Sequence, residues 1–152
     1  MSRKWSPAEW NAFIKGPLAN AITEQANREA LEAGLFEMDN GQKMRILNHK
    51  LYQTGALVNS VKHKINRVSS SGGEGQSGPT VIYGRIHEFG GVITAKNGPY
   101  LHFFSKKTGQ WVKTKSVTIP ARPYMRPTVD EDKDRIVRAA STAFESAIER
   151  LF

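Results

Sequence analysis

The sequence predicts an α+β fold, in which a small antiparallel or mixed β-sheet carries N-terminal helices and a long C-terminal helix packed on it. Three observations support this fold class. Apolar residues recur every three or four positions in residues 1–34 and again in residues 127–152, which is typical of amphipathic helices. Residues 51–127 instead contain short apolar runs between glycine- and proline-rich turns, which is typical of strands. The 152 residues suffice for one core, so we expect a single domain over 1–152.

The N-terminal helices have recognisable start and stop signals. Ser6 and Glu9 have the spacing of a capping box, in which each side chain bonds the backbone N–H of the other residue. Gly16-Pro17 is expected to break the first helix and to open a longer second one. Gly34 is expected to end that second helix, because glycine is common just after a helix C-terminus.

Beyond residue 34 the pattern changes from helix to turns and strands. Asp39-Asn40-Gly41 has the composition of a turn. Residues 61–68 alternate with a period of two, which predicts a strand. Residues 69–78 (SSSGGEGQSG) hold no core-forming side chain, so we expect a flexible surface loop there. Residues 79–83 are expected to form a short strand, and residues 86–91 a tight helical turn ended by two glycines.

A β-hairpin and a last helix complete the predicted fold. Residues 100–104 and 110–117 are its two strands, joined by a turn at Lys107-Thr108-Gly109. The C-terminal helix is expected to begin near Pro127, since proline suits a first helical turn. The acidic side chains of residues 130–134 then lie at the positive end of the helix dipole. That position explains them without a metal site.

The composition narrows the classes of function. The chain contains no cysteine, which excludes disulfides and thiolate metal sites and suggests folding in a reducing cytoplasm. No apolar run reaches the ~20 residues of a membrane span, and none has the layout of a signal peptide. The formal net charge is +8, which indicates either a solvated basic surface or attraction to nucleic acid or an acidic protein.

No catalytic or metal-binding constellation is present in the sequence. His87-Glu88 resembles the start of a zinc protease motif, but Gly91 stands where the second histidine is required. The four histidines are scattered without the spacing of metal ligands. We therefore expect a protein that is not an enzyme and that uses no cofactor.

One stretch combines basic and aromatic side chains in a way that suits single-stranded nucleic acid. Trp111 lies between Lys107 and Lys113 on the predicted hairpin, with Lys106 and further aromatic residues nearby. Proteins that bind single strands stack bases on such aromatic side chains, while lysines contact the phosphates. A basic nucleic-acid-binding module is therefore the alternative function, although no recognised RNA- or DNA-binding signature is present.

Three segments carry a resemblance to a known family. The first is residues 51–60 (LYQTGALVNS), and the second is residues 83–91 (YGRIHEFGG). The third is residues 119–127 (IPARPYMRP), which the terminal helix follows. In this order they resemble Leu-x-x-Thr-Gly-x-Leu-x-x-Ser, Tyr-Ala-x-x-His-x-Phe-Gly-Gly and Ile-Pro-Ala-Arg-Pro-Phe-Leu of the tail-completion (neck, head–tail joining) proteins of long-tailed bacteriophages and the related phage virion morphogenesis family. Gly84 replaces the usual alanine, and Tyr124-Met125 replaces Phe-Leu.

The resemblance implies a structural role in the virion. It implies a small α+β protein that forms a homo-oligomeric ring, expected to be a hexamer, at the head-proximal end of a phage tail. The ring would join the tail terminator or tail tube protein to the head-completion or connector protein, and DNA would pass through its lumen. The implied location is the tail or neck of the virion after assembly in the host cytoplasm, with no membrane partner.

The matched positions are the residues expected to shape subunit contacts. A glycine turn and a Pro-Ala-Arg-Pro segment have few accessible conformations, which suits them to hold a fixed surface. These residues are Thr54, Gly55 and Leu57, then Tyr83, His87, Phe89, Gly90 and Gly91, then Pro120, Arg122, Pro123 and Tyr124.

Arg122 has two possible roles that the sequence leaves open. Its guanidinium offers a rigid fork of donors, so it is a candidate for an ion pair between subunits. A salt bridge to an acidic residue of its own chain is the other reading. His87 and Phe89 are expected to be packing residues that fix the turn.

Overall fold

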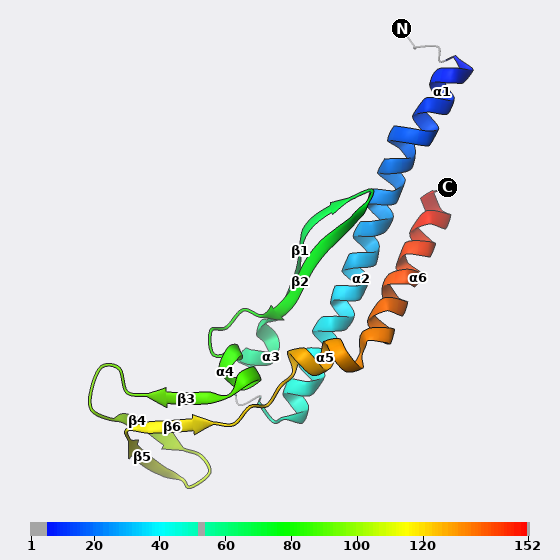
Figure 1. Ribbon diagram of the computed structural model, residues 1–152. Coiled ribbons are helices and arrows are strands. Elements are labelled where there is room, and N and C mark those ends of the chain that lie inside the picture. The colour runs from blue at the N-terminus through cyan, green and yellow to red at the C-terminus, as the bar shows by residue number, and fades with distance from the viewer. Residues whose placement is uncertain (1–5, 52–53, 152) are drawn as a thin grey trace.

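The computed structural model describes residues 6–51 and 54–151, and the chain has an elongated shape (Figure 1). Helix α1 (Pro7–Phe13), a π-helical turn η1 (Ile14–Leu18) and helix α2 (Ala19–Asn48) follow one another as one long rod. Helix α6 (Lys133–Leu151) runs beside α2. The two chain ends lie at one end of the molecule, and the strands within residues 91–119 lie at the other.

The N-terminal capping box is confirmed. The Ser6 backbone N–H donates to Glu9 Oε2 at 2.9 Å, and the Glu9 N–H donates to Ser6 Oγ at 3.2 Å. The predicted break at Gly16-Pro17 is wrong, because the chain passes through it as the π-helical turn η1. A π turn accommodates the proline by widening the local hydrogen-bond pattern.

The predicted helix stop at Gly34 and the predicted turn at Asp39-Asn40-Gly41 are also wrong, since α2 continues unbroken to Asn48. Both glycines serve close packing instead. A Cβ on Gly41 would lie 2.5 Å from Asp132 Oδ2 and 2.7 Å from Thr128 Cγ2, so only glycine lets the following helix cross α2 there. A Cβ on Gly34 would be in ordinary contact with Ala140 of α6, 3.5 Å away.

The C-terminal helical region begins slightly earlier than predicted and is divided. Helix α5 (Met125–Glu131) ends at Asp132, and α6 then turns to run along α2. The Arg45 guanidinium of α2 fixes this corner through ion pairs with Asp132 at 2.6 Å and Glu131 at 2.8 Å. The long last helix therefore packs mainly on α2, whereas the sequence analysis expected it on the sheet.

The strands form three separate two-stranded antiparallel ribbons. Strand β1 (Val61–Ser69) pairs with β2 (Gly72–Pro79), β3 (Gly91–Thr94) with β6 (Ser116–Ile119), and β4 (Leu101–Ser105) with β5 (Gln110–Thr114). The α+β class, the strand over 61–68 and the hairpin are confirmed. The predicted strand over 110–117 is divided into β5 and β6, and the strand over 79–83 is absent, because β2 ends at Pro79.

The predicted flexible loop over 69–78 is wrong, because Gly72–Pro79 is strand β2. Its glycines allow the strand backbone to lie directly on α2. A Cβ on Gly75 would lie 2.5 Å from Leu35 Cδ1 and 3.0 Å from the Lys64 carbonyl oxygen, and a Cβ on Gly73 would overlap Leu31 in the same way. The absence of side chains is therefore what places this strand, since it lets the leucines of α2 fill the space.

A polar network fastens the β1–β2 ribbon to α2. His63 Nδ1 lies 2.7 Å from Asp39 Oδ2, and its Nε2 lies 2.9 Å from Glu32 Oε1. The Ser77 hydroxyl of β2 donates to the other oxygen of Asp39. Hydrogen bonds to Glu32 and Asp39 raise the pKa of His63 above its usual 6.5, because both carboxylates favour the protonated ring.

The core lies where α2, α3 (Ala56–Ser60), β1 and the start of α5 meet. Ile46, Leu57, Val61 and Tyr124 form its buried cluster. A short helix α4 (Gly84–Phe89) packs beside it. Within the described residues, no helix is both long enough and apolar enough to cross a lipid bilayer.

We predict that Gly75→Ala destabilises the fold by about 1–3 kcal/mol, because the new methyl group overpacks the contact with Leu35. Urea unfolding followed by circular dichroism measures the change. Gly98→Ala is the matched control, since a Cβ there meets no atom within 4 Å, and its effect should stay within about 0.5 kcal/mol. Equal stability of both variants would contradict the packing role of the β2 glycines.

We also predict a pH dependence that originates at His63. Because its pKa is raised in the folded state, its stabilising contribution is complete below about pH 6.5 and is lost as the pH rises through the folded-state pKa. The free energy of unfolding should therefore fall over that window in the wild type. His63→Gln should flatten the fall, whereas His102→Gln, on the exposed strand β4, should leave it unchanged. A fall that persists in His63→Gln would assign it to other groups.

Candidate assembly site

The three motif segments lie far apart in the sequence but meet around Tyr124. This side chain is fully buried, and its hydroxyl donates to the carbonyl oxygen of Gly84 at 2.9 Å. Leu57 of the first motif belongs to the same buried cluster. Tyr124 thus contacts the second motif through its hydroxyl and the first through its ring. Burial, with the nearby Glu88 carboxylate as the lesser cause, raises the pKa of Tyr124 to about 12.

Glu88 is the residue that binds the second motif to the third. Its carboxylate is buried and accepts three backbone N–H groups, from Tyr124 at 2.7 Å, Met125 at 2.9 Å and Arg126 at 3.0 Å. These groups belong to the start of α5, where N–H groups have no partner within the helix. Charge-assisted bonds of this kind are among the stronger ones in proteins. The Glu88 carboxylate therefore joins the short helix α4 to the start of α5, in addition to the hydrogen bond between the Tyr124 hydroxyl and Gly84.

The backbone of the third motif crosses the glycine turn at very short range. Gly90 has a φ of +68°, and a Cβ there would lie 2.7 Å from the Ala121 nitrogen and 2.9 Å from the Ile119 oxygen. The Arg122 backbone N–H donates to the His87 carbonyl oxygen at 2.7 Å. Only glycine permits this crossing, because both the positive φ and the contact exclude a side chain.

Five of the expected site residues line one hollow of about 350 Å³ on the surface. Its walls include Lys50 and Leu51 from the end of α2 and the segment after it. The remaining lining residues are Thr54, Leu57, Tyr83, His87 and Arg122. Gly55 precedes helix α3 with a φ of +72°, where it lets the chain turn beside this hollow.

Two groups of the hollow have no partner among the described residues. Arg122 is exposed and forms no ion pair within that part of the chain, so the salt bridge to its own chain is absent there. His87 Nδ1 is buried without a hydrogen bond, and its ring stands edge-on to Tyr83 at 6.2 Å. Burial first, and then the positive charge of Arg122, lowers the pKa of His87 below 6.5. The hollow therefore contains a cation beside a histidine that favours its neutral form.

Phe89 lies outside this hollow, on the exposed side of α4. Its ring is more than half exposed and lies between two guanidinium groups, with Arg85 at 5.8 Å and Arg126 at 5.7 Å from the ring centroid. Such cation–π contacts stabilise an exposed ring modestly, by about 0.5–1 kcal/mol each. They hold an apolar side chain in place on the surface.

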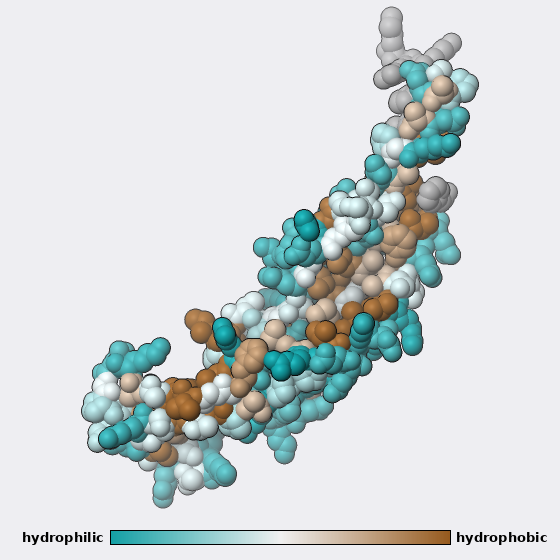
Figure 2. Space-filling model, in the orientation of Figure 1, coloured by the Kyte–Doolittle hydropathy of each residue, from teal (hydrophilic) through white to brown (hydrophobic). Residues whose placement is uncertain are grey.

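Residues 91–119 form an arm that projects from the body beyond Gly90 and Pro120 (Figure 1). Figure 2 shows brown, apolar residues on this arm at the surface. Trp111 is 76% exposed, and its ring meets Phe104 edge-to-face at 5.8 Å. The Lys113 ammonium lies 4.6 Å from the centre of the Tyr100 ring. Lys106 and Lys107 stand in the turn between β4 and β5.

Two kinds of catalytic arrangement can be checked against the described residues, a metal site and a hydrolytic triad. Among the described residues, no group of three histidine, cysteine or acidic side chains has metal-binding geometry. Ser77, Asp39 and His63 are the types found in a hydrolytic triad, but Asp39 lies between the other two. In a triad the histidine must contact the serine oxygen. The second ring nitrogen of His63 is instead hydrogen-bonded to Glu32.

Comparison with protein families gives a match to the phage virion morphogenesis family over residues 29–145. The match covers 117 of the 152 residues. The chain belongs to this family. No curated protein and no solved structure matches it. Family membership gives the chain a structural or assembly role in a bacteriophage virion.

All three motif segments and the arm fall inside the family match, which begins within α2. The structure brings the second and third motifs into direct contact and places Leu57 of the first in the same core. It separates the four basic and aromatic residues of the arm from this junction. Glu88 was not among the expected site residues. A helix N-terminus favours a negative charge, yet the first turn of α5 contains no acidic residue. The sequence therefore requires an acid from elsewhere, and Glu88 is the acidic residue of the second motif.

We predict that Glu88→Gln lowers the free energy of unfolding by about 2–4 kcal/mol. The amide has the same shape but loses the negative charge, and its NH2 group has no acceptor among the three N–H groups that Glu88 binds. Glu24→Gln, at an exposed position of α2, should change stability by no more than about 0.5 kcal/mol. Thermal and urea unfolding of the two variants provide the measurement. A loss below about 1 kcal/mol for Glu88→Gln would mean that packing alone holds the junction.

Proposed function

We propose that this protein forms a ring in the phage neck, at the head-proximal end of the tail, and joins the tail to the head. The tail terminator or tail tube protein would meet one face of the ring, and the head-completion or connector protein would meet the other. The observation that carries this proposal is the arm, which exposes apolar side chains that its own chain leaves uncovered.

The surface area supports an assembled state. The chain exposes 10926 Å². A compact monomer of 17.0 kDa would expose about 7,700 Å². The excess of roughly 3,000 Å² is comparable to what obligate interfaces bury. An isolated two-stranded ribbon is marginal in water, and the arm consists of two such ribbons. Contact with other protein chains would supply the missing burial.

The hollow at the three-motif junction supports a contact between protein chains. Arg122 and Lys50 give it positive charge, and neither forms an ion pair within the described residues. A carboxylate from a neighbouring subunit would pair with Arg122 there, since a guanidinium binds a carboxylate through two parallel hydrogen bonds. The glycine turn and the Pro-Ala-Arg-Pro segment would keep the hollow in one shape during assembly.

Nucleic-acid binding remains the second candidate because of one feature of the arm. Residues 91–119 contain five lysines and no acidic residue. In a ring through which DNA passes, such an arm would contact phosphates if it faced the lumen.

We predict that phage lacking this protein produce separate heads and tails, because the proposed ring is the joint between them. Electron microscopy of the lysate counts joined and separate particles. Arg122→Ala supplied in trans should fail to restore joining, while the purified variant keeps its stability within about 0.5 kcal/mol. Arg138→Ala removes an exposed arginine of α6 that forms no ion pair with any described residue, so it should restore joining and is the matched control.

Two outcomes would contradict the proposal. Normal joined particles in the absence of the protein would exclude a role in the joint. A protein that stays monomeric alone and with every neck partner, measured by native mass spectrometry, would exclude the ring. The Arg122→Ala variant gives a separate check: if the purified monomer loses stability to the same degree as joining is lost, Arg122 belongs to the fold and not to a subunit contact.

A further inference from the structure

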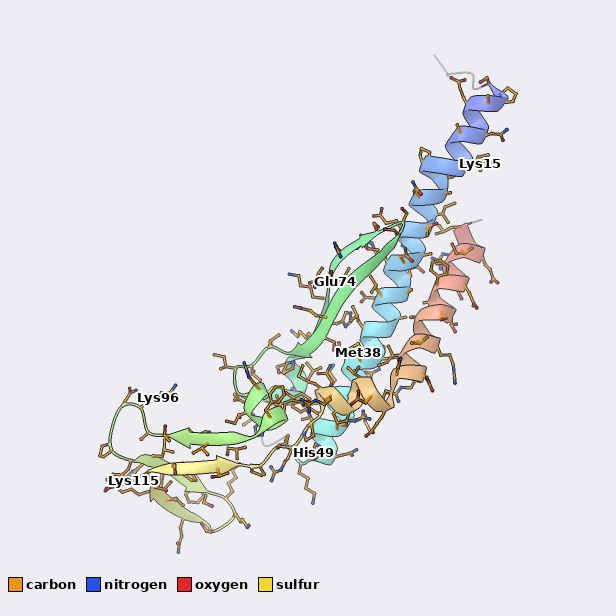
Figure 3. All side chains as sticks on the ribbon, in the orientation of Figure 1. Lys15, Met38, His49, Glu74, Lys96 and Lys115 are labelled. Carbon is orange, nitrogen blue, oxygen red and sulfur yellow. The ribbon has the colours of Figure 1, made fainter. Side chains whose placement is uncertain are left out.

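Charge is segregated along the molecule. The arm, residues 91–119, has five lysines and no acid. The helical body, residues 19–48 and 125–151, has eight lysines and arginines against eleven acidic residues, which gives it a net charge of −3. Lys96 and Lys115 lie on the arm at one end of the molecule, whereas Met38 and Glu74 lie on the body near its middle (Figure 3). The basic and acidic parts of one chain are therefore held apart.

The arm is apolar on both of its faces. Val92 and Ile93 are consecutive in β3, so their side chains point to opposite faces, and both are exposed. Phe103 and Phe104 of β4 repeat this arrangement. An aromatic side chain buries about 150–250 Å² in full, and the four aromatic residues of the arm are still 37–76% exposed, so they would supply roughly 300–500 Å². The exposed Val92 and Ile93 would add to this area, and a stable interface buries about 800 Å² per partner.

The body carries an apolar hollow of about 550 Å³ between α2, α6 and β2. Leu31, Leu35 and Met38 line it from α2, and Ile136, Val137 and Ala140 line it from α6. Gly73 and Gly75 of β2 form one wall of the hollow, and Leu31 and Leu35 lie directly against them. Val137 is more than half exposed at its edge. The arm of the same chain projects away from this face, so it leaves the hollow uncovered (Figure 1).

Two acidic side chains without ion-pair partners in the described part of the chain lie farther along α6 than this hollow. Glu145 and Glu149 are exposed on α6, four residues apart, and neither forms an ion pair among the described residues. Two like charges at this spacing destabilise a helix slightly. Eight residues separate Glu145 from Val137 at the edge of the hollow, which places it about 12 Å farther along α6 and roughly 80° around the helix, and Glu149 lies about one turn beyond it. A basic partner would remove the repulsion.

We propose that the arm of one copy docks on the α2–α6 hollow of a second copy. Phe104 and Trp111 enter the hollow, and Lys106 and Lys107 face Glu145 and Glu149 of that copy. This inference rests on the proposed ring and names its subunit contact. The contact joins two different surfaces, so each copy uses its arm for one neighbour and its hollow for the other. Contacts of this head-to-tail kind close into rings when the rotation between copies allows it.

A second copy fits the arm better than a nucleic acid does. The Phe104 and Trp111 rings meet each other edge-to-face, which occupies surface that bases would need for stacking. Val92 and Ile93 offer aliphatic surface on both faces of β3, and phosphates and bases do not cover such surface well. The acidic, apolar body matches both the charge and the polarity of the arm.

Charge reversal tests the electrostatic half of the contact. One double variant, Lys106→Glu/Lys107→Glu, reverses the charge at the tip of the arm. A second, Glu145→Lys/Glu149→Lys, reverses the charge of the facing side chains on α6. A third variant combines all four substitutions. Each double variant should weaken self-association at least tenfold, and the four-fold variant should recover it. Lys62→Glu/Lys64→Glu on the outer side of β1 is the control with the same change of charge and should have no effect. Analytical ultracentrifugation measures association, and circular dichroism confirms that each variant is folded.

Cross-linking tests the geometry directly, because the chain has no native cysteine. A chain carrying Trp111→Cys and Val137→Cys should form a ladder of covalent multimers on oxidation, in purified protein or in assembled particles. Lys62→Cys with Val137→Cys is the control pair and should form none. The proposal would be overturned if neither the purified protein nor the assembled particles gave a ladder. It would also be overturned if the control pair gave the same ladder.

Two further results would also overturn this contact. One is that the four-fold variant stays as defective as its parents. The other is that reversal of the arm abolishes binding to single-stranded DNA while association is unchanged, which would assign the arm to nucleic acid. In both cases the proposed function stands if the deletion phage still yields separate heads and tails. Joined particles in its absence would instead remove the proposed function itself.

Discussion

The structure depends on one buried carboxylate. Glu88 sits on a helix of only six residues and accepts the first backbone N–H groups of α5. Without it, the buried N–H of Tyr124 and the partly buried N–H groups of Met125 and Arg126 would lose their acceptor, and a buried donor without a partner costs about 1–3 kcal/mol. The carboxylate thereby fixes the direction in which the chain leaves the arm and enters the C-terminal helices. The arm and the hollow at Arg122 both adjoin this junction.

The junction also explains why a chain with such a small core has a defined shape. Few large side chains are fully buried, and several buried groups are polar, among them Asp39, Gln42 and Thr128. Hydrogen bonds and ion pairs therefore do much of the positioning that apolar packing does in compact domains. Arg45 joins α2 to the corner between α5 and α6, and His63 joins β1 to α2. Directional contacts of this kind favour one arrangement over its competitors.

Sequence patterns predict the local elements of this fold well and its long-range contacts poorly. The capping box at Ser6, the strand over 61–68 and the hairpin depend on neighbouring residues, and the chain forms them. Gly34 and Gly41 are compatible with a helix end, but here each faces another helix across a close contact. The same holds for β2, where a glycine-rich segment is ordered by leucines more than thirty residues earlier. A glycine signals a close approach as often as a turn, and the sequence does not name the neighbour.

For the candidate site too, the sequence predicts the local segments but not the contacts between them. The three motifs identify the segments that meet, because their residue types are those of the family. Their meeting is produced by Glu88 and Tyr124, whose partners are backbone atoms and leave no mark in the sequence. The hollow on the α2–α6 face is likewise built from residues of three elements, none of which is unusual by itself.

The length of α2 has a mechanical consequence. Its 30 residues span about 45 Å as a single rod, with the apolar hollow along its middle and the hollow at Arg122 near its C-terminal end. A tilt of roughly 5° at one end of such a rod moves the other end by about 4 Å. In a closed circle of subunits, the angle at which α2 leans would therefore set the diameter of the opening. Residues that fix this angle, such as Gly41 at the crossing with α5, would govern the bore of the channel from well outside it.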